Sequence, residues 1–431
     1  MMNKNLRLKG LSPISHLGQL VYNGLMSRRK GKIAIVGGGM GGLVAGYRLG
    51  QKGYKVTIFE KGEVLGGLLA GFEVEGASLE RAYHHIFESD KEIISLIKEL
   101  DMGDKLSWKR GRIGLYWQKE MWPFNGPVDL LRFGAIPLLD RIRMGLVGLW
   151  LQKDENYQKY IKITAVSWMR KWVGKAGFEV VWGPLLKAKF GEDYDKVSMA
   201  WLWARIHTRS SRLGYLMGGF EQITNRLCEE IKKSGGVIKL KTEVDLEKVK
   251  KDFEIVINTA PVAEVKYLGA VTVVFTSNQN LSRYYWHNIN DPQSPFLAFI
   301  QHTNLVDKDR YGGKDVYYMG TYLPQGHRYF TDDDKTIIND FHGYLKRIYA
   351  EFDEKQIGQI WVHRFRSAQH VVTTDYQEII DRTKRMGRTN KVYNLNFVMI
   401  FPEDRGINYA VREAEKLVKP FARSGHFHSK G

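Results

Sequence analysis

Cysteine is nearly absent from this sequence, since Cys228 is the only one in 431 residues. A single cysteine excludes an intramolecular disulfide and a zinc site built from cysteine pairs. A chain without disulfides is typical of a reducing compartment, so we expect a cytoplasmic protein. A chain of this length also exceeds the size at which one hydrophobic core stops growing, and we therefore expect two lobes.

Long hydrophobic runs are also missing. The apolar stretch 130–153 is interrupted by Asp140, Arg141 and Arg143, so it cannot span a bilayer cheaply. It could lie at the inner face of a membrane, as a peripheral contact with its basic side at the headgroups. The alternative is a helix pair packed inside the protein. The sequence leaves both interpretations open.

The two ends of the chain lack the features of folded elements. Residues 1–30 carry six Lys or Arg and no acidic residue, and their apolar patches are too short for a membrane-spanning helix or a signal peptide. We expect a disordered basic extension there, most of which would be missing if translation started at Met26. Residues 424–431 are expected to fray. Two histidines in that tail do not make a metal site, and we expect no metal.

Acidic residues are outnumbered by basic ones, 47 against 65, which gives a formal net charge of +18. This charge favours anionic ligands or surfaces without choosing among them. The sequence contains no helix-turn-helix, zinc-finger, RRM or KH motif, so we expect no nucleic-acid partner.

Glycine is abundant between residues 33 and 67. An apolar run at 32–36 leads into Gly37, Gly39 and Gly42, a helical stretch at 43–52 follows, and a second apolar run at 55–59 ends at Glu60. This order predicts a strand, turn, helix and strand of a dinucleotide-binding unit. The glycines allow a tight turn, close approach of a pyrophosphate and close helix packing. The carboxylate of Glu60 would accept hydrogen bonds from ribose hydroxyls and repel a 2′-phosphate, which disfavours NADP.

A second glycine pair distinguishes FAD from NAD. Gly66 and Gly67 follow Glu60 by six residues, and they allow another close approach of the backbone to an extended ligand. FAD is therefore the predicted cofactor.

Several stretches together resemble the superfamily of flavin-containing amine oxidases, protoporphyrinogen oxidases and phytoene desaturases. They are the glycine motif with its second strand at 37–67, and the segments 79–102, 168–191, 214–244 and 401–418. The resemblance is closest to the protoporphyrinogen-oxidase-like branch. It implies an α/β fold with a discontinuous, Rossmann-like FAD-binding domain formed by 31–95, 214–265 and 385–423. An α+β substrate domain formed by 96–213 and 266–384 would be inserted into it, and we expect 96–213 to be mostly helical.

The resemblance also implies positions around the cofactor. Val244 matches the segment beside the adenine, Leu68 stands where many relatives place an arginine on the pyrophosphate, and Arg405 precedes a helix whose amino end would face the flavin ring. That helix end would stabilise negative charge on reduced flavin. The residues predicted to surround FAD are Gly37, Gly39, Met40, Gly41, Gly42, Glu60, Lys61, Gly66, Gly67, Leu68, Val244, Thr259, Arg405, Gly406, Asn408, Tyr409 and Ala410.

Candidate catalytic residues are fewer. His84 and His85 resemble a family segment that approaches the flavin, where a histidine could orient substrate or move a proton. They could equally be packed structural residues. Arg405 is the third candidate, with an ion pair to Glu403 or Asp404 as its structural alternative. Six aromatic residues could line a pocket, although we expect most of them in the core: Trp168, Trp172, Phe178, Trp182, Trp201 and Trp203.

The resemblance predicts an FAD-dependent oxidoreductase that takes a hydride from a C–H or C–N centre of an amine, porphyrinogen or polyene-like substrate. Its partners would be that small organic molecule and an electron acceptor. The alternative is a non-redox flavoenzyme of the UDP-galactopyranose mutase type, which has the same architecture and a similar histidine segment.

Overall fold

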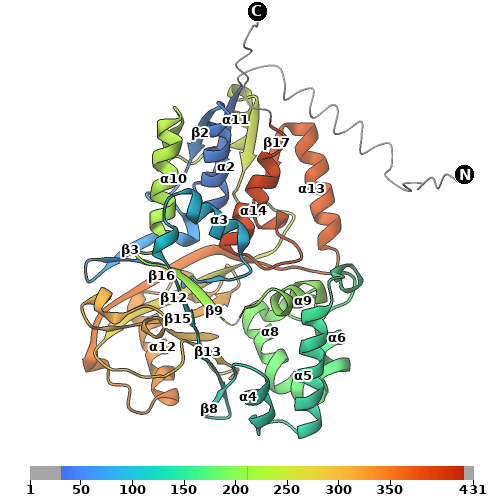
Figure 1. The fold of residues 1–431 in the computed structure, drawn as a ribbon, viewed down its shortest axis with the longest axis vertical. Coiled ribbons are helices and arrows are strands. Elements are labelled where there is room, and N and C mark those ends of the chain that lie inside the picture. Colours follow the sequence, from blue (N-terminus) through green and yellow to red (C-terminus); the bar gives the residue numbers. More distant parts are fainter. Residues whose placement is uncertain (1–30, 211, 422–431) are drawn as a thin grey trace, which may run out of the picture.

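The computed structural model describes residues 31–210 and 212–421. The expected extension at 1–30 and the tail at 424–431 lie outside these residues. The described chain forms two lobes. One contains a parallel sheet with its helices, and the other combines a large mixed sheet with a bundle of helices (Figure 1).

The first lobe is built on a five-stranded parallel sheet. Its strand order is β10 (Val237–Lys239), β2 (Lys55–Phe59), β1 (Lys32–Val36), β11 (Ile255–Asn258) and β17 (Val392–Asn394). The predicted strands at 32–36 and 55–59 are confirmed. The α/β fold predicted from the sequence is confirmed as well. Because the five strands come from three distant parts of the chain, the sheet brings together segments more than 300 residues apart.

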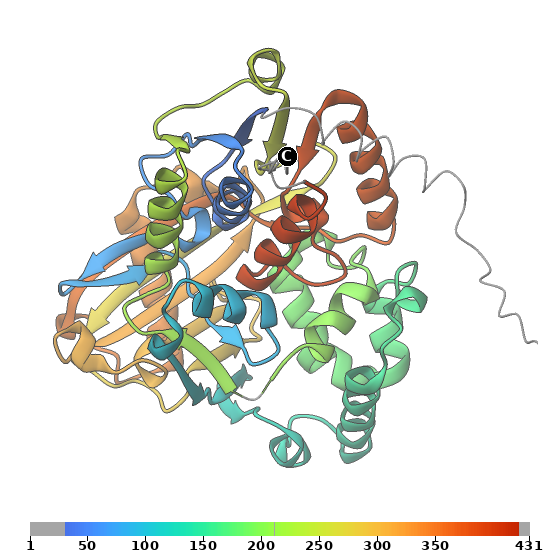
Figure 2. The same ribbon diagram turned by 45° about the horizontal axis from the view of Figure 1, so that its top comes forward.

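Side chains alternate across this sheet. Ile33, Ile35 and Ile257 point into the main core, where α2 (Met40–Gln51) packs between α10 (Glu221–Lys233) and α14 (Ile407–Val418). Ala34 and Val256 point to the other face, which is covered by α11 (Leu246–Asp252). This period of two is the expected pattern of a sheet buried on both faces. Figure 2 shows α14, in red, beside α2, in blue, and α3 (Lys91–Glu99) packs against α14.

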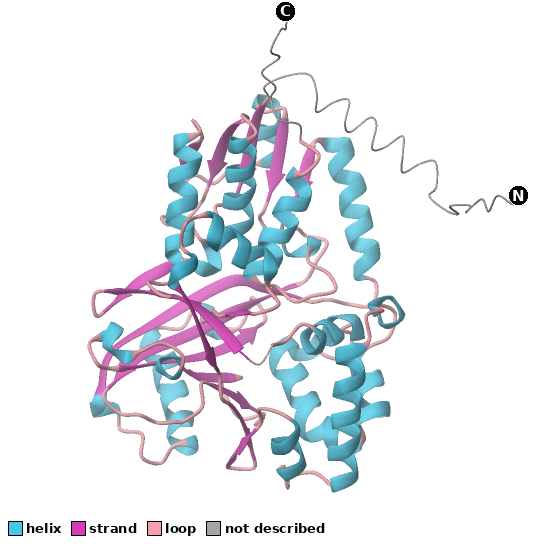
Figure 3. Cartoon of the chain, viewed as in Figure 1, coloured by secondary structure: helices cyan, strands magenta, loops and turns pink. Residues whose placement is uncertain are grey.

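The second lobe divides into a strand-rich half and a helical half (Figure 3). Its seven-stranded sheet has the order β16 (Ile357–His370), β12 (Tyr267–Ser277), β15 (Asp315–Leu323), β14 (Ala298–Gln301), β13 (Trp286–Ile289), β7 (Ile113–Trp117) and β8 (Glu120–Pro123). Every residue of β12 is buried. Two smaller sheets join the lobes: β3 (Gly71–Val74) with β4 (Ala77–Glu80), and β5 (Ile86–Phe87) with β9 (Arg212–Leu216) and β6 (Leu106–Arg110).

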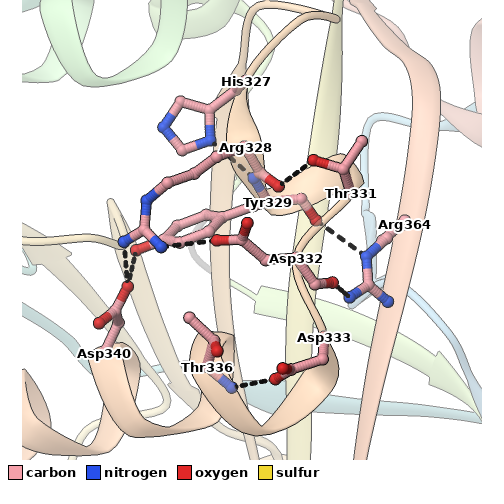
Figure 4. Close-up of polar contacts among 9 residues, drawn as sticks. All are labelled: His327, Arg328, Tyr329, Thr331, Asp332, Asp333, Thr336, Asp340 and Arg364. Carbon is pink, nitrogen blue, oxygen red and sulfur yellow. Dashed lines mark hydrogen bonds and ion pairs between the residues drawn. The ribbon is translucent and has the colours of Figure 1, made fainter.

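A polar network fixes α12 (Asp334–Ile348) against the large sheet (Figure 4). The side chain of Asp333 caps the helix by accepting a 2.7 Å hydrogen bond from the amide of Thr336. From β16, Arg364 donates to the carbonyls of Tyr329 and Asp332, both at 2.8 Å. Since this arginine bonds the turn that leads into α12, the helix start and the strand are held as one unit.

The helical half contains α4 (Pro127–Arg132), α5 (Leu138–Lys153), α6 (Ala165–Val173), α7 (Lys175–Gly177), α8 (Gly183–Phe190) and α9 (Met199–His207). The helix α13 (Tyr376–Asn390) leads back to β17. The expectation of core aromatics is confirmed for Trp168, Phe178, Trp201 and Trp203, which are all buried. It is wrong for Trp172, whose ring contacts Trp150 and Trp168 at the surface of the helical half and is 40% exposed.

The expectation that 96–213 is mostly helical is wrong for residues 106–123. These residues form β6, β7 and β8. Strands β7 and β8 are joined through Gln118 and Lys119, whose φ angles are +51° and +67°. Two left-handed residues form the usual hairpin turn, but asparagine and glycine are its typical residues. The turn therefore gave no recognisable signal in the sequence.

Candidate active site

The glycine turn after β1 has little space for side chains. Gly37 has a φ angle of +106°, and a Cβ there would lie 2.1 Å from Oγ1 of Thr259. A Cβ on Gly42 would lie 2.2 Å from the carbonyl oxygen of Gly37. Gly42 is therefore required for the close approach of α2 to the turn. Thr259 itself donates from Oγ1 to the carbonyl of Val36 at 2.9 Å, so this hydroxyl supports the turn.

Gly39, in contrast, faces open space. A Cβ built on it would meet no atom within 4 Å. The second glycine loop lies against it, since the amide of Gly66 donates to the carbonyl of Gly38 at 2.9 Å and a Cβ on Gly67 would be 3.4 Å from Cα of Gly39. The two glycine loops thus form one backbone cradle.

The amino end of α2 completes this cradle. The helix has no side-chain cap and no acidic residue in its first turn, whereas α6, α9, α11 and α12 are capped by the side chains of Thr164, Ser198, Asp245 and Asp333. Uncapped amides with a positive dipole end favour an anion. The cradle therefore fits a pyrophosphate, with Met40 and Gly41 contributing backbone amides.

Glu60 lies beside the cradle at the end of β2. One carboxylate oxygen accepts from the amide of Gly38 and the other from the amide of Gly62, both at 2.7 Å. These bonds fix the carboxylate and leave lone pairs for ribose hydroxyls. Lys61 is exposed next to it and Val244 is half-buried on the edge of the same domain.

A second uncapped helix end lies at α14. Gly406 is the N-cap residue of this helix. The helix end has no side-chain cap and no acidic residue in its first turn. The side chain of Asn408 is occupied, because it donates to Glu92 at 2.8 Å and accepts from the amide of Ile93 at 3.0 Å. Any contact of Asn408 with a cofactor would thus use its backbone, whereas the amide of Ala410 already donates to the carbonyl of Gly406 at 3.1 Å.

A small cavity lies between the two regions. Two residues that line this cavity are Leu68, which follows the second glycine loop, and Arg405, which precedes the N-cap residue of α14. The remaining lining residues are Ala82, Tyr83, Ala270, Thr272, Gly320, Thr321, Tyr322, Phe365 and Ala368. The nucleotide domain and the large sheet of the second lobe therefore share one cavity.

Hydrogen bonds to the large sheet hold the side chain of Arg405. Its Nε donates to Gln369 at 3.1 Å and its guanidinium also donates to the hydroxyl of Tyr322. Within 31–210 and 212–421, Arg405 forms no ion pair with Glu403 or Asp404. The close ion pairs of these carboxylates are with other residues: Glu403 pairs with Arg412, and Asp404 pairs with Lys189 and Arg205.

The buried carboxylate of Asp404 lies at the centre of a cationic cluster. It is 3.0 Å from Nζ of Lys189 and 2.5 Å from a guanidinium nitrogen of Arg205. Burial raises the pKa of Asp404, but Lys189, Arg205 and Arg405 outweigh this effect and hold it well below its usual range. Three cations against one carboxylate leave an excess of positive charge beside the cavity.

The same cations act on Tyr322. The ammonium of Lys189 lies 4.7 Å from the centre of the Tyr322 ring. Burial raises the pKa of this phenol, but Arg405 and Lys189 outweigh burial and lower the pKa to about 8. Near neutral pH this tyrosine is therefore close to ionisation, unlike an ordinary tyrosine with a pKa of about 10.

We predict that Tyr322→Phe removes a tyrosinate absorbance step centred near pH 8. Tyr329→Phe is the matched control, because burial and a hydrogen bond to Asp340 raise the pKa of Tyr329 to about 12. Near-ultraviolet difference titration of the wild type and both variants measures the step. A step retained in the Tyr322 variant would contradict the prediction.

The two candidate histidines are uncharged at neutral pH. Burial lowers the pKa of His84 to about 4 and that of His85 to about 3. Nδ1 of His84 lies 2.6 Å from the carbonyl oxygen of Ala82, so it carries the proton and leaves Nε2 as an acceptor. Nδ1 of His85 lies 3.1 Å from the hydroxyl of Tyr285. His84 follows the cavity residue Tyr83 directly, while His85 is turned to the aromatic core.

Sequence reasoning missed most of the cavity wall. Tyr322 lines the cavity from a strand of the large sheet. The residues that contact Asp404 or Arg405 behind the wall were missed as well: Lys189 and Arg205 come from helices, and Gln369 from another strand. Tyr83 had a local signal, since it precedes the histidine pair. The others had none, because only the fold brings them to Asp404 and Arg405.

Comparison with known proteins defines the class. The sequence model of one protein family, the flavin-containing amine oxidoreductases, matches residues 40–267, which is more than half of the chain. This chain belongs to that family, as the sequence resemblance predicted, and a flavin is the cofactor of the class.

Individual relatives are more distant. The chain is 23% identical over 209 residues to the mitochondrial protoporphyrinogen oxidase of Nicotiana tabacum, and the match covers 48% of this chain and 41% of the tobacco protein. The chain thus spans less than half the length of this relative.

Solved structures share the fold. A protein from Exiguobacterium sp. 255-15 named for protoporphyrinogen oxidase superimposes with a TM-score of 0.70 at 16% identity, covering 90% of this chain and 98% of that one. Reduced UDP-galactopyranose mutase superimposes with a TM-score of 0.67 at 14% identity, covering 90% and 96%.

Proposed function

We propose that the protein is an FAD-dependent oxidoreductase that takes a hydride from a C–H or C–N centre of an organic substrate. The observation that carries this proposal is that Leu68 and Arg405 line the same cavity. Leu68 adjoins the phosphate cradle and Arg405 adjoins the bare amino end of α14. A dinucleotide extended from one helix end to the other would place its flavin ring at this cavity. When bound, FAD supplies the hydride acceptor.

The chain's own residues would bind and orient the substrate. Tyr83, Thr272 and Phe365 would enclose it, because they line the cavity from both lobes. Arg405 is positioned by Gln369 and Tyr322 to face an anionic group or the flavin ring. Nε2 of His84 is an unprotonated acceptor at neutral pH and is the candidate for accepting a substrate proton.

A second candidate function is non-redox rearrangement of a sugar nucleotide. The excess positive charge around Asp404 favours a substrate with an anionic group, and the fold is shared with UDP-galactopyranose mutase. A porphyrinogen with carboxylates would satisfy the same charge. The two functions differ in whether an electron acceptor is consumed.

The test is a spectrum of the released cofactor followed by anaerobic titration. Porphyrinogens, polyenes, amines and UDP-sugars would be added in turn, with oxygen or a quinone as the acceptor afterwards. We expect a yellow protein that bleaches with one redox substrate and recovers with the acceptor. Turnover of UDP-galactopyranose without acceptor consumption would select the mutase. A colourless protein that binds NAD and no flavin would overturn both.

A further inference from the structure

Exposed apolar side chains are concentrated on one part of the described surface. Fifteen large hydrophobic side chains are exposed in the described ranges, and ten of them lie between residues 128 and 172. Soluble monomers rarely expose a large contiguous apolar patch without a binding role. We call these ten the apolar face: Val128, Leu131, Leu138, Leu139, Ile142, Leu146, Leu149, Trp150, Ile163 and Trp172.

Helix α5 carries most of the apolar face. Its six members, at positions 138, 139, 142, 146, 149 and 150, fall within an arc of about 120° at 100° per residue. Leu139 is 74% exposed and Leu146 is 63% exposed. The opposite side of the helix packs into the bundle through Met144, Val147 and Leu151. Helix α5 is therefore apolar on both sides, and most of its outer side is exposed.

The charges around this face are predominantly basic. Residues 127–175 contain nine Lys or Arg and four Asp or Glu. Three of the acidic side chains are occupied within the protein: Asp129 accepts from Asn125 at 2.7 Å, Asp140 lies 3.8 Å from Arg143, and Asp154 lies 2.6 Å from Lys159. The surroundings of the apolar face are therefore cationic.

Tryptophan and lysine pair at one edge of the face. Nζ of Lys159 lies 5.6 Å from the ring centre of Trp150, and Nζ of Lys171 lies 5.6 Å from that of Trp172. The two indole rings are 5.2 Å apart. Tryptophan and lysine are the side chains that bridge acyl chains and headgroups at a bilayer interface.

We propose that the apolar face docks on the surface of a bilayer that contains anionic lipids, with α5 lying in the plane of the membrane. In the described part of the chain, no helix combines the length and apolarity needed to cross a bilayer, which fits docking on the surface. A symmetric second copy would bring two cationic surfaces together, whereas anionic headgroups neutralise them. Figure 1 shows α4, α5 and α6 at the far end of the molecule from the parallel sheet, so this docking is independent of the proposed reaction.

Flotation of the full-length protein with vesicles tests the proposal. The vesicles are phosphatidylcholine alone or phosphatidylcholine mixed with phosphatidylglycerol. We expect the wild type to float with the mixed vesicles, and less so at high salt. Leu139→Asp with Leu146→Asp should lower the bound fraction by more than about tenfold. The control variant is Val237→Asp with Leu240→Asp. Both residues are exposed on the nucleotide-binding lobe, by 49% and 41%, and this variant should float as the wild type does.

A second pair tests the charges if the leucine variant does not fold. Arg132→Glu with Lys153→Glu changes two exposed side chains and should remove the preference for phosphatidylglycerol. The proposal is overturned if the wild type does not float, or if the leucine and control variants float equally. It is also overturned if the wild type is a dimer that the leucine variant separates, because the occupant is then a second copy.

Discussion

Gly39→Glu is expected to leave the fold intact and to abolish flavin binding. The position has a φ angle of −75°, which any residue adopts, and a new Cβ meets no atom within 4 Å. An acidic side chain at the amino end of α2 favours the helix dipole, so the free energy of unfolding should not fall. The same carboxylate would occupy the cradle and repel a pyrophosphate. We expect FAD affinity to fall at least 100-fold, about 2.7 kcal/mol, measured by titrating the apoprotein with FAD.

The matched control is Gly343→Glu, since Gly343 is exposed on α12 and a Cβ there also meets no atom within 4 Å. This variant should bind FAD as the wild type does. If the Gly39 variant retains full affinity while folded, the dinucleotide does not bind at the glycine cradle, and the assignment of the site fails.

Asp404→Asn is expected to destabilise the protein strongly. The carboxylate pairs with Lys189 and Arg205 in a buried environment, and an amide would leave their charges without compensation. Removing one partner of a buried ion pair costs about 3–5 kcal/mol. Urea unfolding at neutral pH measures the loss. The control Glu378→Gln breaks a pair with Lys162 whose side chains are 64% and 70% exposed, and should change stability by at most about 1 kcal/mol.

The pH dependence of this difference has a defined sign. The pKa of Asp404 is depressed in the folded protein, so its stabilisation is fully present above the unfolded pKa of about 3.9 and declines as the pH falls through the folded pKa. The gap between wild type and variant should thus be constant around neutral pH, below the titration of Tyr322 at about 8, and narrow in strong acid. A gap that grows in acid would contradict this origin.

The nucleotide-binding half of the site was predictable from sequence because its determinants are local. A strand, a turn with defined glycine positions, a helix and Glu60 follow one another within 29 residues, and each has a steric or hydrogen-bonding reason. The first helix of such a unit starts where the turn ends, so the order of strand, turn and helix along the chain is enough to predict the position of the backbone cradle.

The remaining half of the site was not predictable because it depends on long-range packing. Asp404 meets Lys189 and Arg205 across about 200 residues of sequence, and no local pattern marks either cation. The aromatic residues show the same limit. Trp168 and Trp172 share a helical face in the sequence, and the ring of Trp150 on α5 contacts both. Even so, Trp168 is buried and Trp172 is 40% exposed.

The order of strands in the parallel sheet constrains how the protein folds during synthesis. Strands β1 and β2 are made first, but their neighbours β10, β11 and β17 start at residues 237, 255 and 392. Until about two hundred further residues have been translated, β1 and β2 can pair only with each other, and both outer edges stay open. Because closing such distant pairs is slow, we expect the nascent amino-terminal segment to need protection from aggregation for almost half of the time the ribosome takes to make these residues.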